Sequence, residues 1–595
     1  MPHVVVIGGG IGGLSAAHEL VDRGFTVDVY EARPDWGGKA RSQPHGAAPP
    51  GKRPLPGEHG FRFYPRFYKH IIDTMSKIPD GAGFVVDHLQ PTSEAALALI
   101  DNLTWYKFNR KQIGAPYNLI ETLELFFQEL DFDAQDISVY VAKLLEFATS
   151  CDERRLGEYE QMSWWEYLDA TSYSEGFAKS QRGIPRMMVA MDPIVGSANT
   201  IGTISMQLFS DFGATGGHTD RTMGGPTTQM WIDPWVAHLA TRGVGLHLDE
   251  KCTGLSVAAG KISEVTFSGA GTVTADYYVL AVPLETAIQL ITPAMGALDP
   301  ALETLRNEQV DRLVSWMVGI QYFLYEDVPM VRGHLFFPDS PWALTAISQP
   351  QFWRGLGLFR KNYGDGSVGG CISVDVSDWD TPGKLIPKTA KMCTPDEIAE
   401  EVWYQIKSAV NGAGEGGQIL TDDLRHSYHL DTDLDYSGGL PPVNNSRLLV
   451  HPPGSWHVRP EAGTAIPNLV LASDYVKTHT NLATMEGANE AARRAVNAIL
   501  ERSGSTAGKS EVWPLVEPGG VIAVMKMIDR LFYKAGQKHL FQLVGIKQGA
   551  RAAAWLRRFS KLSGIDKIDN WIDERYRPTR FIKLILARFG ITFPS

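Results

Sequence analysis

The chain begins with two short apolar segments that flank a stretch of helical period. Residues 4–7 (VVVI) and 26–30 (TVDVY) are the apolar segments, and residues 14–20 (LSAAHEL) place apolar side chains on one helical face. Short apolar runs of this kind are typical of strands buried in a parallel sheet, and a helix between them predicts a β-α-β unit. The pattern therefore predicts that the chain opens with an α/β domain.

Glycines occupy the turn between the first strand and the helix. Residues 8–13 (GGGIGG) fit the spacing GxGxxG, in which Gly8 makes the tight turn, Gly10 admits a pyrophosphate and Gly13 lets helix and strand pack closely. Gly12 lies in the same turn, and the N-terminus of the helix faces the phosphates. Glu31, 18 residues after Gly13, is placed to hold the ribose hydroxyls and disfavours NADP. Among 59 glycines a lone motif would be weak, but the complete β-α-β context indicates a dinucleotide site.

A second glycine turn follows the acid. Residues 32–42 (ARPDWGGKARS) resemble the turn that follows the ribose-binding acid in the large family of flavin-containing amine oxidases and phytoene desaturases. FAD extends past its pyrophosphate to the isoalloxazine, so a second glycine turn lets the backbone follow it, and the resemblance implies FAD. On the family's pattern the Arg41 guanidinium approaches the flavin end. The cofactor contacts implied in this turn are Ala32, Gly37, Gly38, Lys39 and Arg41.

Residues 471–496 (LASDYVKTHTNLATMEGANEAARRAV) form a sharp strand-to-helix junction late in the chain. In the same family the last strand and helix return to the first β-α-β unit. The resemblance implies that Asp474 lies near the pyrophosphate and ribityl, and that the amides around Glu486, Gly487 and Ala488 face the flavin. A helix N-terminus there stabilises the negative charge of the reduced ring. Relatives usually have glycine where this chain has Ser473, and a surface helix after a strand is the alternative.

Residues 55–65 (LPGEHGFRFYP) resemble a stretch that lies at the flavin and substrate in carotenoid and squalene-type relatives. The resemblance implies that Gly60, Phe61 and Arg62 contact the cofactor, with Arg62 in place of a usual histidine. A fixed cation there favours the anionic reduced flavin or polarises an oxygen leaving group. The alternative is that Arg62 only pairs with Glu58 or Glu31. The candidates for a proton or hydroxyl transfer beside the hydride step are His59, Arg62, Tyr64, Lys477 and His479.

The resemblance covers roughly residues 1–503, strongly at the cofactor segments, and implies a discontinuous, Rossmann-like FAD-binding domain in an α/β fold. We assign residues 1–80, 225–290 and 441–503 to this domain, and residues 81–224 and 291–440 to an α+β substrate domain. The substrate segments are rich in large apolar and aromatic residues, either as plain core or as the lining of a long apolar pocket. Residues 504–595 are expected to form a helical C-terminal extension.

The composition limits the number of domains and the classes of protein that the chain can belong to. A chain of 595 residues with 44% hydrophobic residues is expected to contain two or more domains. Its start lacks the pattern of a signal peptide, and no uncharged apolar run of about 18 residues predicts a spanning helix. The four cysteines are far apart and form no CxxC, so we expect neither a metal site nor a disulfide framework, and a reducing cytoplasm fits best.

The C-terminal extension differs in charge from the rest. Residues 521–595 hold 15 Lys and Arg against 5 Asp and Glu, while the whole chain carries a net charge of −11. Residues 521–532, 555–559 and 580–589 mix apolar and basic side chains at helical spacing, which suits peripheral attachment to the inner, anionic face of the cell membrane. The alternative is a helical cap on the acidic body. We expect no nucleic-acid partner, because no binding motif accompanies the charge.

These features together predict an FAD-dependent oxidoreductase of the desaturase or dehydroxylase kind. It would transfer hydride between flavin N5 and a hydrophobic isoprenoid or other lipid taken from the membrane. A flavin amine oxidase that releases peroxide and a non-redox flavin isomerase remain alternatives. A prenyl-lipid carrier would be expected to have a decayed cofactor site, whereas the glycines and Glu31 are intact. A homo-oligomer, the electron acceptor and the direction of the redox change are left open.

Overall fold

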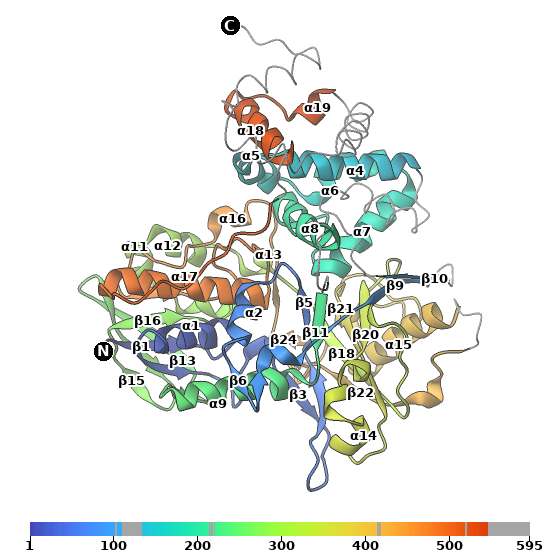
Figure 1. The fold of residues 1–595 in the computed structure, drawn as a ribbon, viewed down its shortest axis with the longest axis horizontal. Helices are drawn as coiled ribbons and strands as arrows, with labels where there is room; N and C mark the ends of the chain where they lie inside the picture. The colour runs from blue at the N-terminus through green and yellow to red at the C-terminus, as the bar shows by residue number, and fades with distance from the viewer. Residues whose placement is uncertain are drawn as a thin grey trace.

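The structure is a computed structural model that describes residues 1–100, 104–109, 134–213, 218, 220–412, 418–517 and 521–544. Figure 1 shows three regions: a sheet flanked by helices, a second sheet beside it, and a group of helices above both. The predicted basic segments 555–559 and 580–589 lie outside the described residues.

The first region is built on a five-stranded parallel sheet with the order β12-β2-β1-β16-β26. Its strands are β1 (His3–Ile7), β2 (Thr26–Tyr30), β12 (Gly245–His247), β16 (Tyr277–Leu280) and β26 (Leu469–Leu471). Val4 pairs with Val27 on one side and with Tyr277 on the other, so the predicted β-α-β unit lies at the centre of the sheet. Every strand comes from the three segments that the sequence assigns to cofactor binding.

Two helices cover this sheet and pack against each other: α1 (Ile11–Val21) and α17 (Met485–Ser503). Their contact surfaces contain small buried residues, among them Ala16, Ala17, Ala491 and Ala495, which let helices approach closely. The same core cluster includes Leu302, Leu305 and Leu313 from helices that the sequence places in the substrate domain. These helices are α11 (Pro293–Leu298), α12 (Pro300–Arg306) and α13 (Val310–Leu313). In this part of the chain the second sheet begins with β18 at residue 318.

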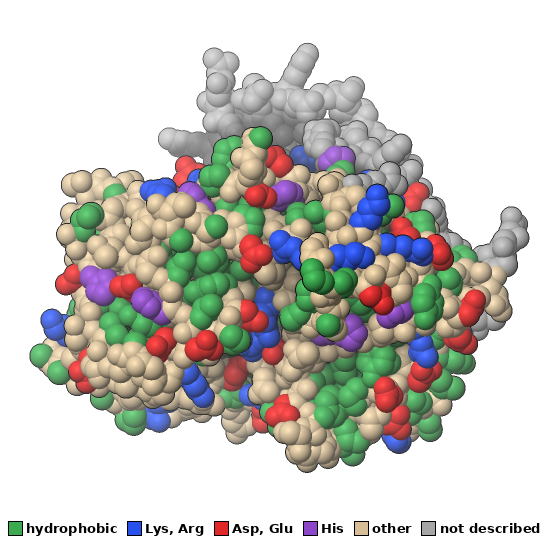
Figure 2. All heavy atoms as spheres, turned by 90° about the horizontal axis from the view of Figure 1, so that it is seen from below, with side chains coloured by type: hydrophobic (Ala, Val, Ile, Leu, Met, Phe, Trp, Pro, Cys, Tyr) green, Lys and Arg blue, Asp and Glu red, His purple; other side chains and the backbone are tan. Residues whose placement is uncertain are grey.

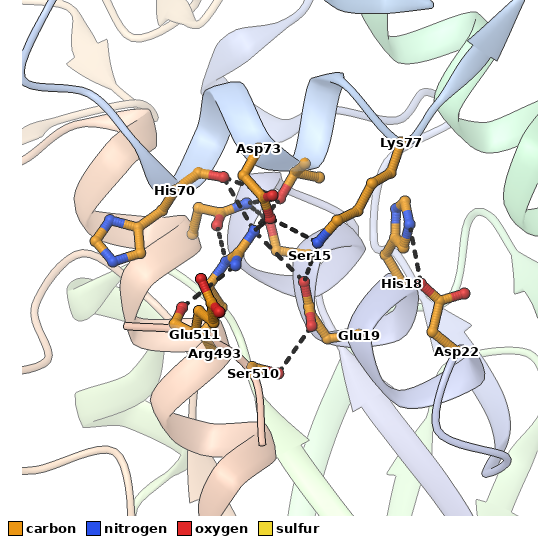
Figure 3. A network of polar contacts seen from close by, with 12 residues as sticks. Ser15, His18, Glu19, Asp22, His70, Asp73, Lys77, Arg493, Ser510 and Glu511 are labelled. Atoms are coloured by element: carbon orange, nitrogen blue, oxygen red, sulfur yellow. Dashed lines mark hydrogen bonds and ion pairs between the residues drawn. The ribbon is translucent and has the colours of Figure 1, made fainter. Parts of the chain in front are cut away.

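A buried network of polar contacts ties α1 and α17 to α2 (His70–Met75), as Figure 3 shows. The Arg493 guanidinium donates to Asp73 Oδ2 at 2.6 Å and lies 3.4 Å from Glu19 Oε1. Ser510 Oγ donates to Glu19 Oε2 at 2.8 Å, so the segment after α17 joins the same network. Because Arg493 and Glu19 are almost fully buried, each needs these partners to offset its desolvation.

The second region is a seven-stranded sheet with the order β10-β9-β19-β20-β21-β18-β22. Its strands are β9 (Glu94–Leu99), β10 (Thr104–Asn109), β18 (Val318–Leu324), β19 (Gly333–Phe336), β20 (Leu344–Ser348), β21 (Gly370–Val376) and β22 (Arg425–Leu430). Its neighbouring strands are antiparallel, except that β9 and β19 are parallel. Helix α15 (Pro395–Gly412) covers one face over a core that includes Trp342, Trp379 and Trp403.

The third region is helical and lies above both sheets in Figure 1. It contains α4 (Ala134–Thr149), α5 (Asp152–Gly157), α6 (Trp164–Leu168), α7 (Glu175–Val189) and α8 (Ala198–Gly213). From the C-terminal extension, α18 (Val521–Lys534) and α19 (Leu540–Val544) contact α4. Asp529 of α18 and Arg154 of α5 form a buried ion pair at 2.9 Å, so this part of the extension is docked on the body.

Shorter elements connect the three regions. The remaining strands are β3 (Ser42–His45), β4 (Leu55–Glu58), β5 (Phe63–Pro65), β6 (Pro79–Asp80), β7 (Gly83–Phe84), β8 (Leu89–Pro91), β11 (Asp220–Met223), β13 (Cys252–Ala258), β14 (Lys261–Phe267), β15 (Gly271–Val273), β17 (Val314–Ser315), β23 (Leu434–Asp435), β24 (Val443–Asn444) and β25 (Leu448–Leu449). The remaining helices are α9 (Asp233–Thr241), α10 (Leu284–Leu290), α14 (Phe359–Asn362) and α16 (Ser455–Val458).

Candidate active site

A cavity of about 1140 Å³ is lined by residues of the two sheets and of the helical region. It begins at the carboxyl end of β1 and extends to β9, β19 and α8. Predicted cofactor or catalytic residues that line it are Gly8, Gly10, Gly12, Glu31, Ala32, Gly37, Gly38, Lys39, His59, Phe61, Arg62, Asp474 and Ala488. Predicted residues that are not among its lining residues are Gly13, Arg41, Gly60, Tyr64, Lys477, His479, Glu486 and Gly487.

The two glycine turns meet at the start of the cavity. Gly10 forms a bridge with Gly37, and a Cβ atom added to Gly38 would lie 3.1 Å from the Gly10 Cα. Gly8 has a φ of +109°, and a Cβ on Gly13 would lie 1.8 Å from the Gly8 carbonyl oxygen. Gly13 therefore lets α1 pack on β1, while the other glycines leave a wall of bare backbone that a pyrophosphate can approach.

Glu31 lies at the end of β2, where the sequence predicts the ribose-binding acid. Its Oε2 accepts a hydrogen bond from the Gly9 N–H at 2.6 Å, and its Oε1 accepts one from the Arg33 N–H at 3.0 Å. Burial raises the pKa of Glu31, although these two N–H groups and the Arg33 charge oppose the shift. The carboxylate is thus held in place beside the glycine turn, with lone pairs left to accept from hydroxyl groups.

The N-terminus of α17 points into the cavity. Thr484 caps this helix by accepting a hydrogen bond from the Gly487 N–H at 3.1 Å, and Met485 and Ala488 line the cavity. Gly487 is needed for another reason, because a Cβ there would lie 2.6 Å from the Leu482 carbonyl oxygen. The helix end therefore offers unpaired amides and a positive dipole end to a ligand.

The Glu486 side chain points away from the cavity and caps a different helix. Its carboxylate accepts hydrogen bonds from the backbone N–H groups of Lys69 at 2.8 Å, His70 at 2.9 Å and Ile71 at 2.9 Å. These amides belong to the first turn of α2, which would otherwise be left unsatisfied in a buried position. Glu486 thus fixes α17 against α2 and is not among the residues that line the cavity.

Arg41 is buried behind the second glycine turn, in contrast to the predicted approach to the flavin end. Its guanidinium donates to Asp433 Oδ1 at 2.9 Å and to the Gly38 carbonyl oxygen at 2.7 Å. Arg33, which does line the cavity, contacts the same Asp433 at 3.0 Å. The role of Arg41 in this structure is therefore to brace the turn from behind through a partner 392 residues away.

Three of the predicted catalytic residues lie elsewhere. Tyr64 is fully buried, and its ring packs edge-on against Trp231. The Lys477 amine lies over the Trp456 ring, 5.9 Å from its centroid. His479 is exposed, and its backbone N–H donates to Glu490. The structure does not bring these three side chains to the cavity.

His59 lines the cavity and is held from behind by an acidic group. Its Nδ1 is hydrogen bonded to Asp431 Oδ2. Burial tends to raise the pKa of Asp431, but the hydrogen bond and charge of His59 outweigh it and hold that pKa well below its usual range. His59, Asp431 and Asp433 place ligand-type atoms within 4.8 Å of one another, yet Arg33 and Arg41 already balance the charge of Asp433.

Arg62 also lines the cavity. Its Nη2 donates to the Lys39 carbonyl oxygen at 2.8 Å and lies 3.9 Å from Glu58 Oε2. Its Nε is buried with no hydrogen-bond partner. The pairing with Glu58 that the sequence allowed is therefore present, and one donor of Arg62 remains free beside the second glycine turn.

Asp375 is an acidic cavity residue that sequence reasoning missed. It lies near the end of β21, its Oδ1 is buried with no hydrogen-bond partner, and it lines the cavity together with Arg62 and His59. Burial raises the pKa of the Asp375 carboxyl to about 7, against the lowering effects of the Arg62 charge and the Phe61 N–H. The available signal was a single acid within an otherwise apolar strand (GCISVDV).

The far part of the cavity is apolar and aromatic. Its lining there includes Leu97, Leu99, Ile204, Leu208, Phe336, Phe63, Trp316 and Met317. Most of these side chains come from β9, α8 and β19, in segments that the sequence assigns to the substrate domain. The cavity therefore joins a backbone-lined start to an apolar end, and its volume exceeds that of a pocket for one ordinary ligand.

The residues present fit FAD. The paired glycine turns provide a cradle for a pyrophosphate, Glu31 is placed for a ribose, and the end of α17 and the free Arg62 Nε offer donors further along. A parallel sheet with a dinucleotide cradle at the carboxyl ends of its strands, joined to a second domain across one cavity, defines a nucleotide-dependent oxidoreductase fold.

Comparisons with known proteins agree with this class. The family model "Flavin containing amine oxidoreductase" matches residues 11–500, so the chain belongs to that family and is an FAD-dependent oxidoreductase. The zeta-carotene desaturase of Synechocystis sp. is 24% identical over 538 residues, covering 84% of this chain and 97% of the relative. A probable zeta-carotene desaturase of Synechococcus elongatus is 23% identical, with 84% and 98% covered.

Solved structures show the same fold. Cyclohexylamine oxidase from Brevibacterium oxydans aligns with a TM-score of 0.57 at 16% identity and covers 84% of this chain and 99% of its own. Putrescine oxidase bound to putrescine aligns with a TM-score of 0.56 at 12% identity, with the same coverage. The chain is thus similar in sequence to carotene desaturases and in fold to amine oxidases.

Proposed function

We propose that this protein oxidises a long hydrophobic substrate of the isoprenoid or lipid class, in a desaturase-like or dehydroxylase-like reaction. The observation that carries the proposal is the continuity of one cavity from the glycine cradle to an apolar end lined by residues such as Leu99, Leu208 and Phe336. Similarity to zeta-carotene desaturases over 84% of the chain supports the same substrate class.

Bound FAD supplies the acceptor for a hydride, and the chain supplies binding, orientation and charge control. The glycine turns and Glu31 hold the nucleotide end, while the α17 N-terminus and Arg62 provide positive potential where negative charge develops. The apolar end binds the substrate and excludes water. His59, oriented by Asp431, is within the same cavity and can hold or release a proton at its other ring nitrogen.

An anaerobic titration tests the proposal. The purified protein, loaded with FAD, is mixed in detergent or liposomes with phytoene-type and squalene-type lipids and with a panel of amines, and the flavin absorption is followed. We expect bleaching by the isoprenoids. Bleaching by the amines alone would contradict the proposal.

An amine oxidase is the second candidate, and one observation favours it. The buried Asp375 carboxyl is free to accept a hydrogen bond inside the cavity, and an ionised acid there would attract an ammonium group. The structural similarity to cyclohexylamine oxidase and putrescine oxidase shows the fold alone. Release of peroxide with amines in air would establish this alternative.

We also propose that the substrate is collected at an anionic membrane surface through the C-terminal extension. Among the helices that the structure describes, none combines the length and apolar character that a membrane crossing requires. Helix α18 docks through Met525, Ile528 and Phe532, while Met527 and Leu531 remain exposed on its outer side. On the opposite face of the molecule, acidic and basic side chains of the described residues are interspersed with hydrophobic ones (Figure 2).

The basic residues of α18 are partly neutralised by the body. Lys526 contacts Asp152 at 3.1 Å, and Arg530 contacts Glu153 at 2.8 Å, as a docked cap would require. The remaining positive charge of the extension is what would attract anionic lipid. Sedimentation with anionic and with neutral vesicles tests this, and equal recovery with both would contradict the proposal.

A further inference from the structure

Asp375 occupies a position that the packing of the fold alone does not explain. It lies on β21 between Gly319 of β18 and Thr345 of β20, and its carboxyl group turns toward residues 59–62. A Cβ atom on Gly60 would lie 2.9 Å from Asp375 Oδ1, so Gly60 is the residue that leaves room for this carboxyl. Sequence analysis predicts a cofactor contact for Gly60, but its closest constraint in the structure is Asp375.

The Asp375 carboxyl is more than nine-tenths buried, and one of its two oxygens has no hydrogen-bond partner, although the Phe61 N–H acts on the group. Its Oδ1 accepts no hydrogen bond, whereas most buried polar atoms in proteins are paired. The acid also forms no ion pair within 4.0 Å among the described residues, although the charge of Arg62 acts on it. A buried carboxyl with one unpaired oxygen that lines a cavity is available to a ligand in that cavity.

The other charged groups around the cavity are already engaged. Arg186 of α7 pairs with Asp378 and Asp192, and His59 is hydrogen bonded to Asp431. The titratable and charged groups that line the cavity near Asp375, apart from Asp375 itself, are His59, Arg62, Arg186, His334 and Asp339. Asp375 is therefore an acid with a free oxygen that lines the cavity together with Arg62 and His59.

We propose that Asp375 is the catalytic base that removes a proton from the hydrophobic substrate, at the carbon next to the one that would lose hydride. This inference rests on the proposed function. It assigns to the substrate-side sheet a chemical role that none of the five catalytic candidates from the sequence has.

The chemistry balances with FAD as the oxidant. One substrate carbon loses a hydrogen together with both bonding electrons to the flavin. The adjacent carbon loses H⁺ to the Asp375 carboxylate, and the electron pair left from that C–H bond becomes the new C=C π bond. The substrate is oxidised by two electrons, the flavin is reduced by two, and the proton on Asp375 then passes to solvent.

The first experiment compares Asp375→Asn with the wild type in the FAD-loaded protein. Asn has nearly the same shape and carries no charge, so we expect the variant to fold, to hold FAD and to bind a phytoene-type polyene with unchanged affinity. Anaerobic bleaching of the flavin by that polyene should slow about 10²–10⁴-fold, the usual contribution of a positioned base. Wild-type rates in Asp375→Asn would overturn the proposal.

Two further variants act as controls. Ser373→Ala lies two residues earlier on the same strand, and its hydroxyl accepts from Gln321 outside the cavity lining, so we expect the wild-type rate. Asp375→Glu keeps a carboxyl and should recover part of the lost rate. If Asp375→Glu and Asp375→Asn are equally slow, the role as a base is overturned.

A second measurement needs neither cofactor nor turnover. The infrared carbonyl band of a protonated carboxyl, recorded for the protein without FAD between pH 5 and 8, should titrate near neutrality and disappear in Asp375→Asn. An Asp375 carboxyl that stays protonated up to pH 8 would overturn the proposal, because a base must be ionised to accept a proton. If the wild type is not bleached by any polyene, the proposed function fails instead, and the role in desaturation fails with it, whatever the infrared titration shows.

Discussion

The two ends of the cavity are built in different ways. The cofactor end is made largely of backbone: glycine turns approach each other so closely that a Cβ on Gly38 would come within 3.1 Å of Gly10. The substrate end is made of side chains such as Leu208 and Phe336, from strands and helices far apart in the sequence. A wall of backbone tolerates almost no substitution, whereas a wall of side chains can be reshaped to suit another substrate. One family can therefore keep its cofactor and change its chemistry.

The largest effect is expected at the backbone end. Gly13→Val would place side-chain atoms where a Cβ already lies 1.8 Å from the Gly8 carbonyl oxygen, so α1 could not pack on β1. We expect a loss of more than about 4 kcal/mol of stability and no bound FAD. Thermal unfolding and the flavin spectrum measure both. Gly254→Ala is the matched control, since no atom lies within 4 Å of its added Cβ, and a normal spectrum for Gly13→Val would refute this account of the turn.

The next effect concerns the pH dependence of stability at the junction of the two ends. Burial raises the pKa of Asp375 from its ordinary value of 3.8 to about 7 in the folded protein, so folding favours the neutral form. The contribution of Asp375 is fully present below pH about 4 and is lost as pH rises through about 7. Asp375→Asn should therefore gain stability relative to the wild type on going from pH 5 to pH 9, by about 3 kcal/mol. Denaturant unfolding at both pH values measures this, and a constant difference would contradict it.

A smaller effect is expected at the side-chain end. Leu208→Trp would fill part of the apolar lining without touching the glycine turns. We expect an unchanged flavin spectrum and a Kd for a long polyene raised about 10- to 100-fold, while binding of a short amine stays the same. Leu298→Trp, at an exposed position on α11, serves as the control. Equal losses of FAD and polyene binding would show that the two ends are not independent.

The smallest effect is expected for Arg62, which donates to the second glycine turn and whose charge acts on Asp375. Arg62→Met removes a cation near the predicted flavin position, so the reduced and negatively charged form should lose about 1–2 kcal/mol of stabilisation. That loss lowers the two-electron potential by about 30 mV. A spectroelectrochemical titration of the bound flavin measures it. Arg62→Lys should fall between the two, and an unchanged potential would place Arg62 in a purely structural role with Glu58.

The same contrast explains which parts could be predicted from the sequence. The first strand, the glycine turn and the second strand follow one another within about 30 residues, so local pattern is enough to predict them. The fold family is shown by the comparisons, and the cofactor segments that carry the resemblance lie within residues 11–500. The positions of individual side chains, in contrast, are set by partners that lie far away in the sequence. Arg41 pairs with Asp433, and Glu486 caps α2 more than 400 residues before it, which no local pattern reveals.

Asp375 shows why the substrate end is harder to predict. Its position near residues 59–62 results from the pairing of β18, β20 and β21 beside the first domain, and from the space left by Gly60. A lone acid in an apolar strand carries no motif. Tyr64, Lys477 and His479 have suitable chemistry and lie close in sequence to cofactor segments, but their side chains pack or point elsewhere.

The polar network around Arg493 has a consequence for how the chain can be divided. The family match ends at residue 500, yet Ser510 donates to Glu19, and the Trp513 N–H donates to His70 at 2.9 Å. A chain shortened to the limits of the family would lose both of these donors: Glu19 would keep only its contacts with basic side chains such as Arg493, and His70 Nε2 would lose the N–H that it accepts from. The family match thus ends before the last residues that pack against the cofactor domain. A shortened protein for expression should retain the segment through residue 513, because Ser510 and Trp513 donate hydrogen bonds to the cofactor domain.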